Sequence, residues 1–106
     1  MIAHPERNEI HLEGVLHALS DPVRLGIVRE LAEAGGERRC GSFVHAVTKS
    51  TMTHHFKVLR EAGVIRQRQE ATLRLTSLRR EDLDTRFPGL LDRILEAAED
   101  EAVLRA

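Results

Sequence analysis

The sequence predicts a mainly α-helical domain that carries one small β-hairpin. Apolar residues recur at helical spacing over most of the chain, whereas two short runs, residues 64–69 and 72–78, alternate apolar and polar side chains as strands do. The chain has 42% apolar and 31% charged residues and lacks Trp and Tyr, which is typical of a soluble helical protein with an aliphatic core. Its 106 residues predict one small domain.

The first helix is expected within residues 8–20, after a flexible tail over residues 1–7. Asn8 is a candidate N-cap, and the apolar residues that follow it have helical spacing. Because they spread over a wide arc, we expect this helix to contact both its own core and a second subunit.

A second helix is predicted from Asp21-Pro22 to about residue 34. Asp can cap a helix, Pro suits its first position, and the glycine pair at 35 and 36 can end it with positive φ angles. The connector at residues 37–40 is predicted to be a short strand.

Residues 42–63 are predicted to form a helix-turn-helix. Ser42 can cap a brief helix through residue 47, and Thr48 can cap a longer helix that ends at Gly63. The N-terminal part of such a second helix enters the DNA major groove, so we interpret it as a recognition helix; an ordinary amphipathic surface helix is the alternative. Its apolar stripe is Met52, Phe56, Leu59 and Gly63, and its opposite face is Ser50, Thr53, His54 and Lys57.

Two further elements complete the predicted winged helix-turn-helix domain of residues 8–106. Residues 64–78 form a hairpin wing with a turn at Glu70-Ala71, and its arginines at 66, 68 and 74 are candidates for the minor groove or phosphates. Residues 88–104 form a final acidic helix whose apolar stripe needs a partner. The simplest partner is the same helix of a second copy, and packing within the monomer is the alternative.

The net charge of −1 conceals a segregation of charge along the chain. Residues 49–80 hold eight Lys and Arg against two Glu, a net +6, whereas residues 1–48 come to −2 and residues 81–106 to −5. A basic middle between acidic ends favours a phosphate-binding surface with separate dimerisation elements, and solvated helix faces are the alternative.

The chain contains the segments ALSDPVRLGIVREL and STMTHHFKVLREAGVI. Together they resemble the ArsR/SmtB family of winged helix-turn-helix regulators. The resemblance covers about residues 12–78. It implies a homodimer held by its first and last helices, a repressor that binds a near-palindromic DNA operator and responds to a ligand. The two recognition helices would then lie about one DNA turn, roughly 34–36 Å, apart.

The resemblance also assigns roles within the recognition helix. His55 corresponds to a packing histidine of the family, which agrees with its position near the apolar stripe. With the wing residues Arg66, Arg68 and Arg74, the predicted DNA contacts are Lys49, Ser50, Thr51, Thr53, His54 and Lys57.

The metal sites of the family are not reproduced in this sequence. Where many relatives have a Cys-x-Cys pair, this chain reads Cys40-Gly41-Ser42, and no histidine follows His55. The remaining candidates for nickel, zinc or cobalt are His4, His11 and His17, for which solvated histidines are the alternative. Cys40 is a candidate thiol sensor beside Arg38 and Arg39, and a buried structural cysteine is the alternative.

These observations favour one class of function. We expect a cytoplasmic, sequence-specific DNA-binding regulator, because no apolar run could span a membrane and the N-terminus lacks a secretory signal pattern. A winged-helix protein-interaction module without DNA readout is the alternative. The residues do not form a nucleophile-base pair with a group to orient it, so we expect no enzymatic activity.

Overall fold

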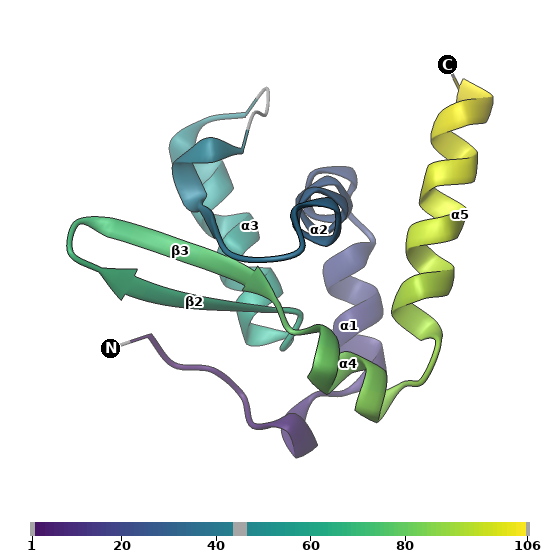
Figure 1. The fold of residues 1–106 in the computed structure, drawn as a ribbon, viewed down its shortest axis with the longest axis horizontal. Helices are drawn as coiled ribbons and strands as arrows, with labels where there is room; N and C mark the ends of the chain where they lie inside the picture. Colours follow the sequence, from purple (N-terminus) through teal and green to yellow (C-terminus); the bar gives the residue numbers. More distant parts are fainter. Residues whose placement is uncertain (1, 44–46, 106) are drawn as a thin grey trace.

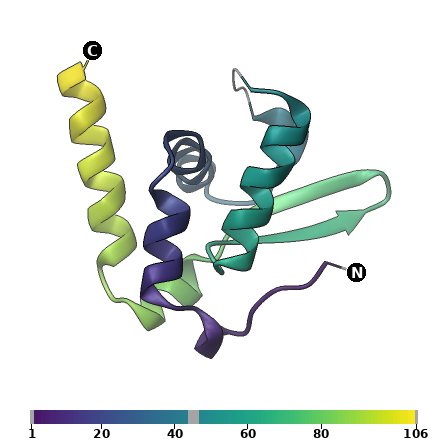
Figure 2. The ribbon, with the colours of Figure 1, turned by 180° about the vertical axis from the view of Figure 1, so that it is seen from behind.

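The computed structural model describes residues 2–43 and 47–105. A central group of helices lies between a three-stranded sheet and a long C-terminal helix, and the hairpin points away from that helix (Figures 1 and 2). The helices are α1 Leu12–Leu19, α2 Pro22–Ala34, α3 Lys49–Glu61, α4 Arg80–Arg86 and α5 Leu90–Arg105. The strands are β1 Arg38–Arg39, β2 Ile65–Glu70 and β3 Leu73–Leu78. Two short 3-10 turns are η1 Arg7–Glu9 and η2 Cys40–Ser42. None of the helices described has the length and apolar character needed to cross a membrane.

Local sequence signals account for both ends of α2. The Asp21 carboxylate accepts hydrogen bonds from the backbone N–H groups of Val23 (2.8 Å) and Arg24 (3.2 Å). Gly35 follows the last helical residue with φ 71°, the left-handed conformation that glycine adopts at low cost. The predicted helix is therefore confirmed at its start and at its end.

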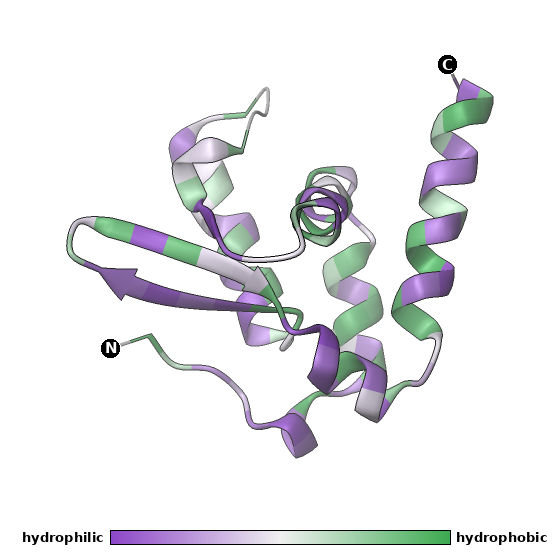
Figure 3. Cartoon of the chain, in the orientation of Figure 1, coloured by the Kyte–Doolittle hydropathy of each residue, from purple (hydrophilic) through white to green (hydrophobic). Residues whose placement is uncertain are grey.

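The sheet is antiparallel with the order β1-β3-β2, and the predicted short strand at the connector is confirmed as β1. In the hairpin, Gln67 pairs with Thr76 and Glu70 pairs with Leu73. The turn is therefore at residues 71–72, one residue later than predicted, and Ala71 has a φ of 55°. Hydrophobic and hydrophilic residues alternate along β3, whereas β2 is mostly hydrophilic (Figure 3).

The core is aliphatic, with two phenylalanines, and it joins α1, α2, α3, α4, α5 and the sheet, with Leu91 as the buried residue of α5. The apolar stripe of α3 faces it through Phe56 and Leu59, as predicted. Gly63 has φ 84°, and a Cβ built there would lie 2.5 Å from Cγ1 of Ile10. The absence of a side chain at 63 therefore lets the segment before α1 pack against the end of α3.

The N-terminal segment differs from both predictions made for it. The first α-helix begins at Leu12 rather than near Asn8, because residues 7–9 form a 3-10 turn in which Glu6 and Glu9 make a capping box. Residues 2–6, expected to be a flexible tail, are anchored instead. The Gln67 backbone N–H donates to Nε2 of His4 (2.9 Å), and Arg79 Nη1 donates to the Pro5 carbonyl (2.8 Å). β2 is an edge strand, so this contact satisfies an N–H group of its open side.

The C-terminal part contains a helix that the sequence analysis missed. In α4, Leu83 is buried in the core and Arg86 donates two hydrogen bonds to the Ile10 carbonyl (3.1 and 2.7 Å). The final helix starts at Leu90 rather than Pro88, because Gly89 has φ 81° and separates it from α4. The brief helix predicted at residues 42–47 lies largely on residues 44–46, outside the described residues, and Phe43 before them is extended.

Candidate nucleic-acid interface

The solvent-facing side of α3 carries the polar residues predicted to contact DNA. Thr48 caps the helix, because its hydroxyl accepts a hydrogen bond from the Thr51 backbone N–H (3.3 Å). Met52 is half-buried, and His55 is buried with the apolar stripe, as predicted. All six predicted contacts on α3 are exposed, namely Lys49, Ser50, Thr51, Thr53, His54 and Lys57.

The hydroxyl groups at the start of α3 are partly engaged with the helix itself. The Thr48 hydroxyl lies 3.2 Å from the Ser50 hydroxyl and donates to the Thr51 hydroxyl at 2.9 Å, and the Thr53 hydroxyl donates to the Lys49 carbonyl at 3.0 Å. The side chains of His54 and Lys57 have no hydrogen-bonding partner among the described residues, so their polar ends are open to a ligand.

A buried contact between α2 and α3 fixes the orientation of this face. Arg24 Nη1 lies 3.2 Å from Nδ1 of His55, while its Nε and Nη2 donate to the carbonyls of Ala18 (2.7 Å) and His17 (3.3 Å). Arginine has no acceptor, so His55 accepts through Nδ1 and carries its proton on Nε2. Sequence reasoning missed the role of Arg24, although Arg24 lies in the segment ALSDPVRLGIVREL that carries the family resemblance.

The three wing arginines leave opposite faces of the sheet, although all three side chains line an open hollow beside His4 at the edge of β2. Directly paired residues of an antiparallel sheet share a face, so Arg68, opposite Leu75, lies on one face with Arg66, and Arg74, opposite Gln69, lies on the other. The face of Arg74 is the one that looks toward α3, since Arg74 and Gln67 line a cavity together with residues of that helix. The wing therefore offers one of the three predicted arginines on the side of the recognition helix.

The two arginines on the opposite face have carboxylate partners. Arg68 donates to both oxygens of Glu37 (2.6 and 2.8 Å) and lies 2.8 Å from Glu70, and Arg66 lies 3.6 Å from Asp82. The hydrogen bonds with Glu37 raise the pKa of Arg68 and lower the pKa of Glu37. Arg74 has no carboxylate partner within the part of the chain that the structure describes, so its charge is not compensated.

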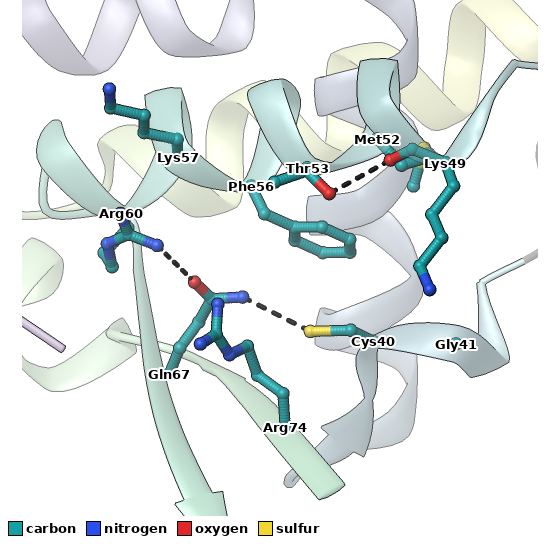
Figure 4. Close-up of a pocket in the computed structure, with 10 residues that line it drawn as sticks. All are labelled: Cys40, Gly41, Lys49, Met52, Thr53, Phe56, Lys57, Arg60, Gln67 and Arg74. Atoms are coloured by element: carbon teal, nitrogen blue, oxygen red, sulfur yellow. Dashed lines mark hydrogen bonds between the residues drawn. The ribbon is translucent and has the colours of Figure 1, made fainter. Parts of the chain in front are cut away.

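A cavity of about 240 Å³ lies between α3, the wing and the segment at residues 40–41 (Figure 4). The Phe56 ring faces its centre, and Lys57 points away from it. Arg60 on α3 donates to Oε1 of Gln67 at 2.8 Å and so links the recognition helix to the wing.

The histidines considered as metal ligands lie apart. His4 is on the edge of β2, where burial and then the charges of Arg66, Arg79 and Arg60 lower its pKa, and its Nε2 is used by Gln67. His11 and His17 are exposed at opposite ends of α1. In residues 2–43 and 47–105, no group of three or more His, Cys, Asp or Glu side chains could hold a metal ion.

Cys40 is half-buried in the wall of the cavity. Its Sγ lies 3.0 Å from the Thr76 hydroxyl and accepts a hydrogen bond from Nε2 of Gln67 at 3.3 Å. Arg38, expected to favour its thiolate, donates to the Ser42 carbonyl and lies over the Phe43 ring.

Comparisons with known proteins agree with this architecture. Residues 19–68 match a family model described as a helix-turn-helix domain. The chain is 38% identical over 82 residues to the uncharacterized HTH-type transcriptional regulator YceK of Bacillus subtilis, covering 76% of this chain and 82% of that one. It is also 35% identical over 60 residues to the uncharacterized HTH-type transcriptional regulator MJ1325 of Methanocaldococcus jannaschii, covering 55% of this chain and 66% of that one.

Solved structures show the same fold. The transcriptional repressor BigR from Xylella fastidiosa superposes with a TM-score of 0.58 at 28% identity, covering 72% of this chain and 85% of that one. An ArsR family transcriptional regulator superposes with a TM-score of 0.64 at 18% identity, covering 95% and 99% of the two chains. The chain belongs to the helix-turn-helix transcriptional regulators, which are DNA-binding proteins, and it has the winged fold of the ArsR family structure.

Proposed function

We propose that the protein is a homodimeric repressor that binds a near-palindromic operator with the exposed face of α3 and with Arg74. The observation that carries this proposal is the position of Arg74, an uncompensated charge on the wing face that looks toward the recognition helix. Within α3, we assign Ser50, Thr53 and His54 to base edges and the remaining predicted residues, Lys49, Thr51 and Lys57, to phosphates. Arg66 and Arg68 lie on the opposite wing face, and their ion pairs favour a smaller role.

The proposal of a dimer rests on exposed apolar side chains of α1 and α5. Leu12 and Leu16 are 43% and 47% exposed on α1, and Val103 and Leu104 are 71% and 87% exposed at the end of α5. A second copy would remove these side chains from water and would place two recognition helices on one face of DNA. The relative BigR is a transcriptional repressor, which supports repression by this chain.

We infer that the protein is not an enzyme and needs no metal to bind DNA. The proposed site consists of side chains that can contact bases and phosphates directly. A regulator of transcription acts where chromosomal DNA is, so we propose a cytoplasmic location.

Selection of duplexes from a random DNA library by the purified protein tests this function. We expect two inverted half-sites whose centres are about 10–10.5 base pairs, or a multiple of that, apart. The selected duplex should bind at least about 1,000-fold more tightly than a random duplex at physiological salt. If no sequence is enriched over non-specific binding, the protein-interaction module is the better account.

A further inference from the structure

The cavity between α3 and the wing combines an apolar interior with a cationic border. Phe56, Met52 and Cys40 supply its apolar surface, and the Phe56 ring faces its centre (Figure 4). The cations at its border are Lys49, Lys57, Arg60 and Arg74, and no carboxylate is found among the described residues that line it. Pockets that bind small molecules have this composition, with apolar walls and a few polar groups that orient the ligand.

The cationic side chains at the border differ in their partners and in their direction. Arg60 is held by the Gln67 side chain, and Lys57 points away from the cavity. The side chains of Lys49 and Arg74 have no hydrogen-bonding or ionic partner within the described part of the chain. These two cations, one on the recognition helix and one on the wing, are therefore available to an anion.

The wall behind the cavity is held by a hydrogen-bonded network. Gln67 accepts from Arg60 and donates to Cys40 Sγ and to the Thr76 hydroxyl, both at 3.3 Å. Gln67 and Thr76 are 3% and 0% exposed, so their positions are fixed by the fold. A wall held in this way loses little conformational entropy when a ligand binds.

We propose that this cavity binds a compact organic anion with an apolar body of about one ring, such as a monocarboxylate. Its volume of about 240 Å³ is below the roughly 300–1,000 Å³ of typical ligand pockets and suits a small ligand. The apolar body contacts Phe56 and Met52, and the carboxylate binds Arg74 and Lys49. The phosphate of DNA could neutralise the same cations, but it has no apolar group to place against Phe56.

The regulatory consequence rests on the proposed function. Lys49 is assigned to a phosphate, and we take Arg74 to bind a phosphate as well, so a ligand that occupies both side chains competes with DNA. Since each phosphate contact contributes about one to the slope of log affinity against log salt, a saturating ligand should lower that slope by about two.

Binding is tested without DNA, so that failure of the site and failure of the proposed function give different results. The ¹⁵N-labelled protein is titrated with benzoate, with neutral benzamide and with inorganic phosphate, and the backbone amide shifts are recorded. We expect benzoate to produce saturable shifts at Cys40, Phe56, Gln67 and Arg74, larger than those produced by benzamide or phosphate. The site is rejected if benzoate gives no saturable shift, if benzamide binds equally well, or if phosphate reproduces the benzoate shifts.

Two charge-neutralising variants complete the test. Arg74→Gln should weaken benzoate binding by about tenfold, because a charge-assisted hydrogen bond is lost. Arg93→Gln removes the same charge from α5, where Arg93 pairs only with Glu96 among the described residues, and should leave benzoate binding unchanged. Equal effects of the two variants would show a response to net charge and would contradict the assigned site.

Discussion

Arg24 Nη1 lies 3.2 Å from Nδ1 of His55, and both side chains are buried between α2 and the recognition helix. The same guanidinium donates to two carbonyls at the end of α1, at residues 17 and 18. One side chain thus joins three helices, and it holds α3 from its buried face while the opposite face remains free for DNA.

Replacement of Arg24 by lysine should destabilise the fold. A single ammonium group cannot reproduce hydrogen bonds that leave the planar guanidinium in three directions, so we expect Arg24→Lys to lower the free energy of unfolding by about 1–3 kcal/mol. Urea denaturation measures the difference. Arg29→Lys on the same helix is the control, since Arg29 has no hydrogen-bonding partner among the described residues. Equal stability of the two variants would show that the Arg24 contacts contribute nothing.

Substitutions at Gly63 and Gly89 distinguish the cost of the backbone conformation from the cost of a packing clash. Both have positive φ, 84° and 81°, but a Cβ at 63 would lie 2.5 Å from Cγ1 of buried Ile10, whereas a Cβ at 89 meets nothing within 4 Å. We expect Gly89→Ala to cost about 1 kcal/mol from the backbone alone and Gly63→Ala to cost about 2–4 kcal/mol. If thermal or urea denaturation gives the same loss for both variants, the packing of Ile10 against Gly63 is not limiting.

The contact between His4 and β2 should weaken in acid. Burial and nearby arginines lower the pKa of His4 below its usual 6.5, and its Nε2 can accept the Gln67 N–H only when unprotonated. The unfolded chain therefore takes up this proton at a higher pH than the folded chain. The stabilisation is present above the unfolded pKa and is lost as pH falls through the lowered, folded value.

Hydrogen exchange of the Gln67 amide measures this effect. After correction for the intrinsic rate, protection should fall between about pH 7.5 and the acid range below the folded pKa. His4→Leu should abolish both the protection and its pH dependence, whereas His11→Gln, at an exposed position, should change neither. A pH-dependent loss of protection that persists in His4→Leu would assign the effect to another group.

Exposed leucines on two elements distinguish a dimer interface from general surface. We expect Leu16→Glu on α1 to shift the protein from dimer to monomer, because it places a charge in the proposed interface. Leu73→Glu is the matched control, since Leu73 is similarly exposed, at 41%, but lies on the wing. Sedimentation velocity gives the oligomeric state, and a dimer that survives Leu16→Glu would place the interface elsewhere.

Local sequence signals predicted a large part of this fold. Asp21 and the glycine after residue 34 mark the ends of α2, and Thr48 marks the start of α3, because caps depend on neighbouring residues. Periodicity failed for α4, a helix of seven residues in which Leu83 is the buried residue. Such a short element provides too few turns for an apolar pattern.

Contacts between distant residues could not be predicted from local patterns. Arg24 and His55 are 31 positions apart and His4 and Gln67 are 63 apart, so the fold is needed to bring each pair together. The same limit applies to the wing. Alternation of strand residues places Arg74 on the face opposite Arg66 and Arg68, but the face that looks toward α3 is known from the packing.

The central claim is that DNA binds the exposed face of α3 together with Arg74. The most direct measurement is the slope of log affinity against log salt for the selected duplex with wild type, Lys57→Gln, Arg74→Gln and Arg68→Gln. We expect Lys57→Gln and Arg74→Gln each to reduce the slope by about one, while Arg68→Gln, which neutralises an arginine on the opposite wing face, leaves it nearly unchanged. The claim is contradicted if Lys57→Gln and Arg74→Gln both keep the wild-type slope. It is also contradicted if Arg68→Gln reduces the slope as much as Arg74→Gln does.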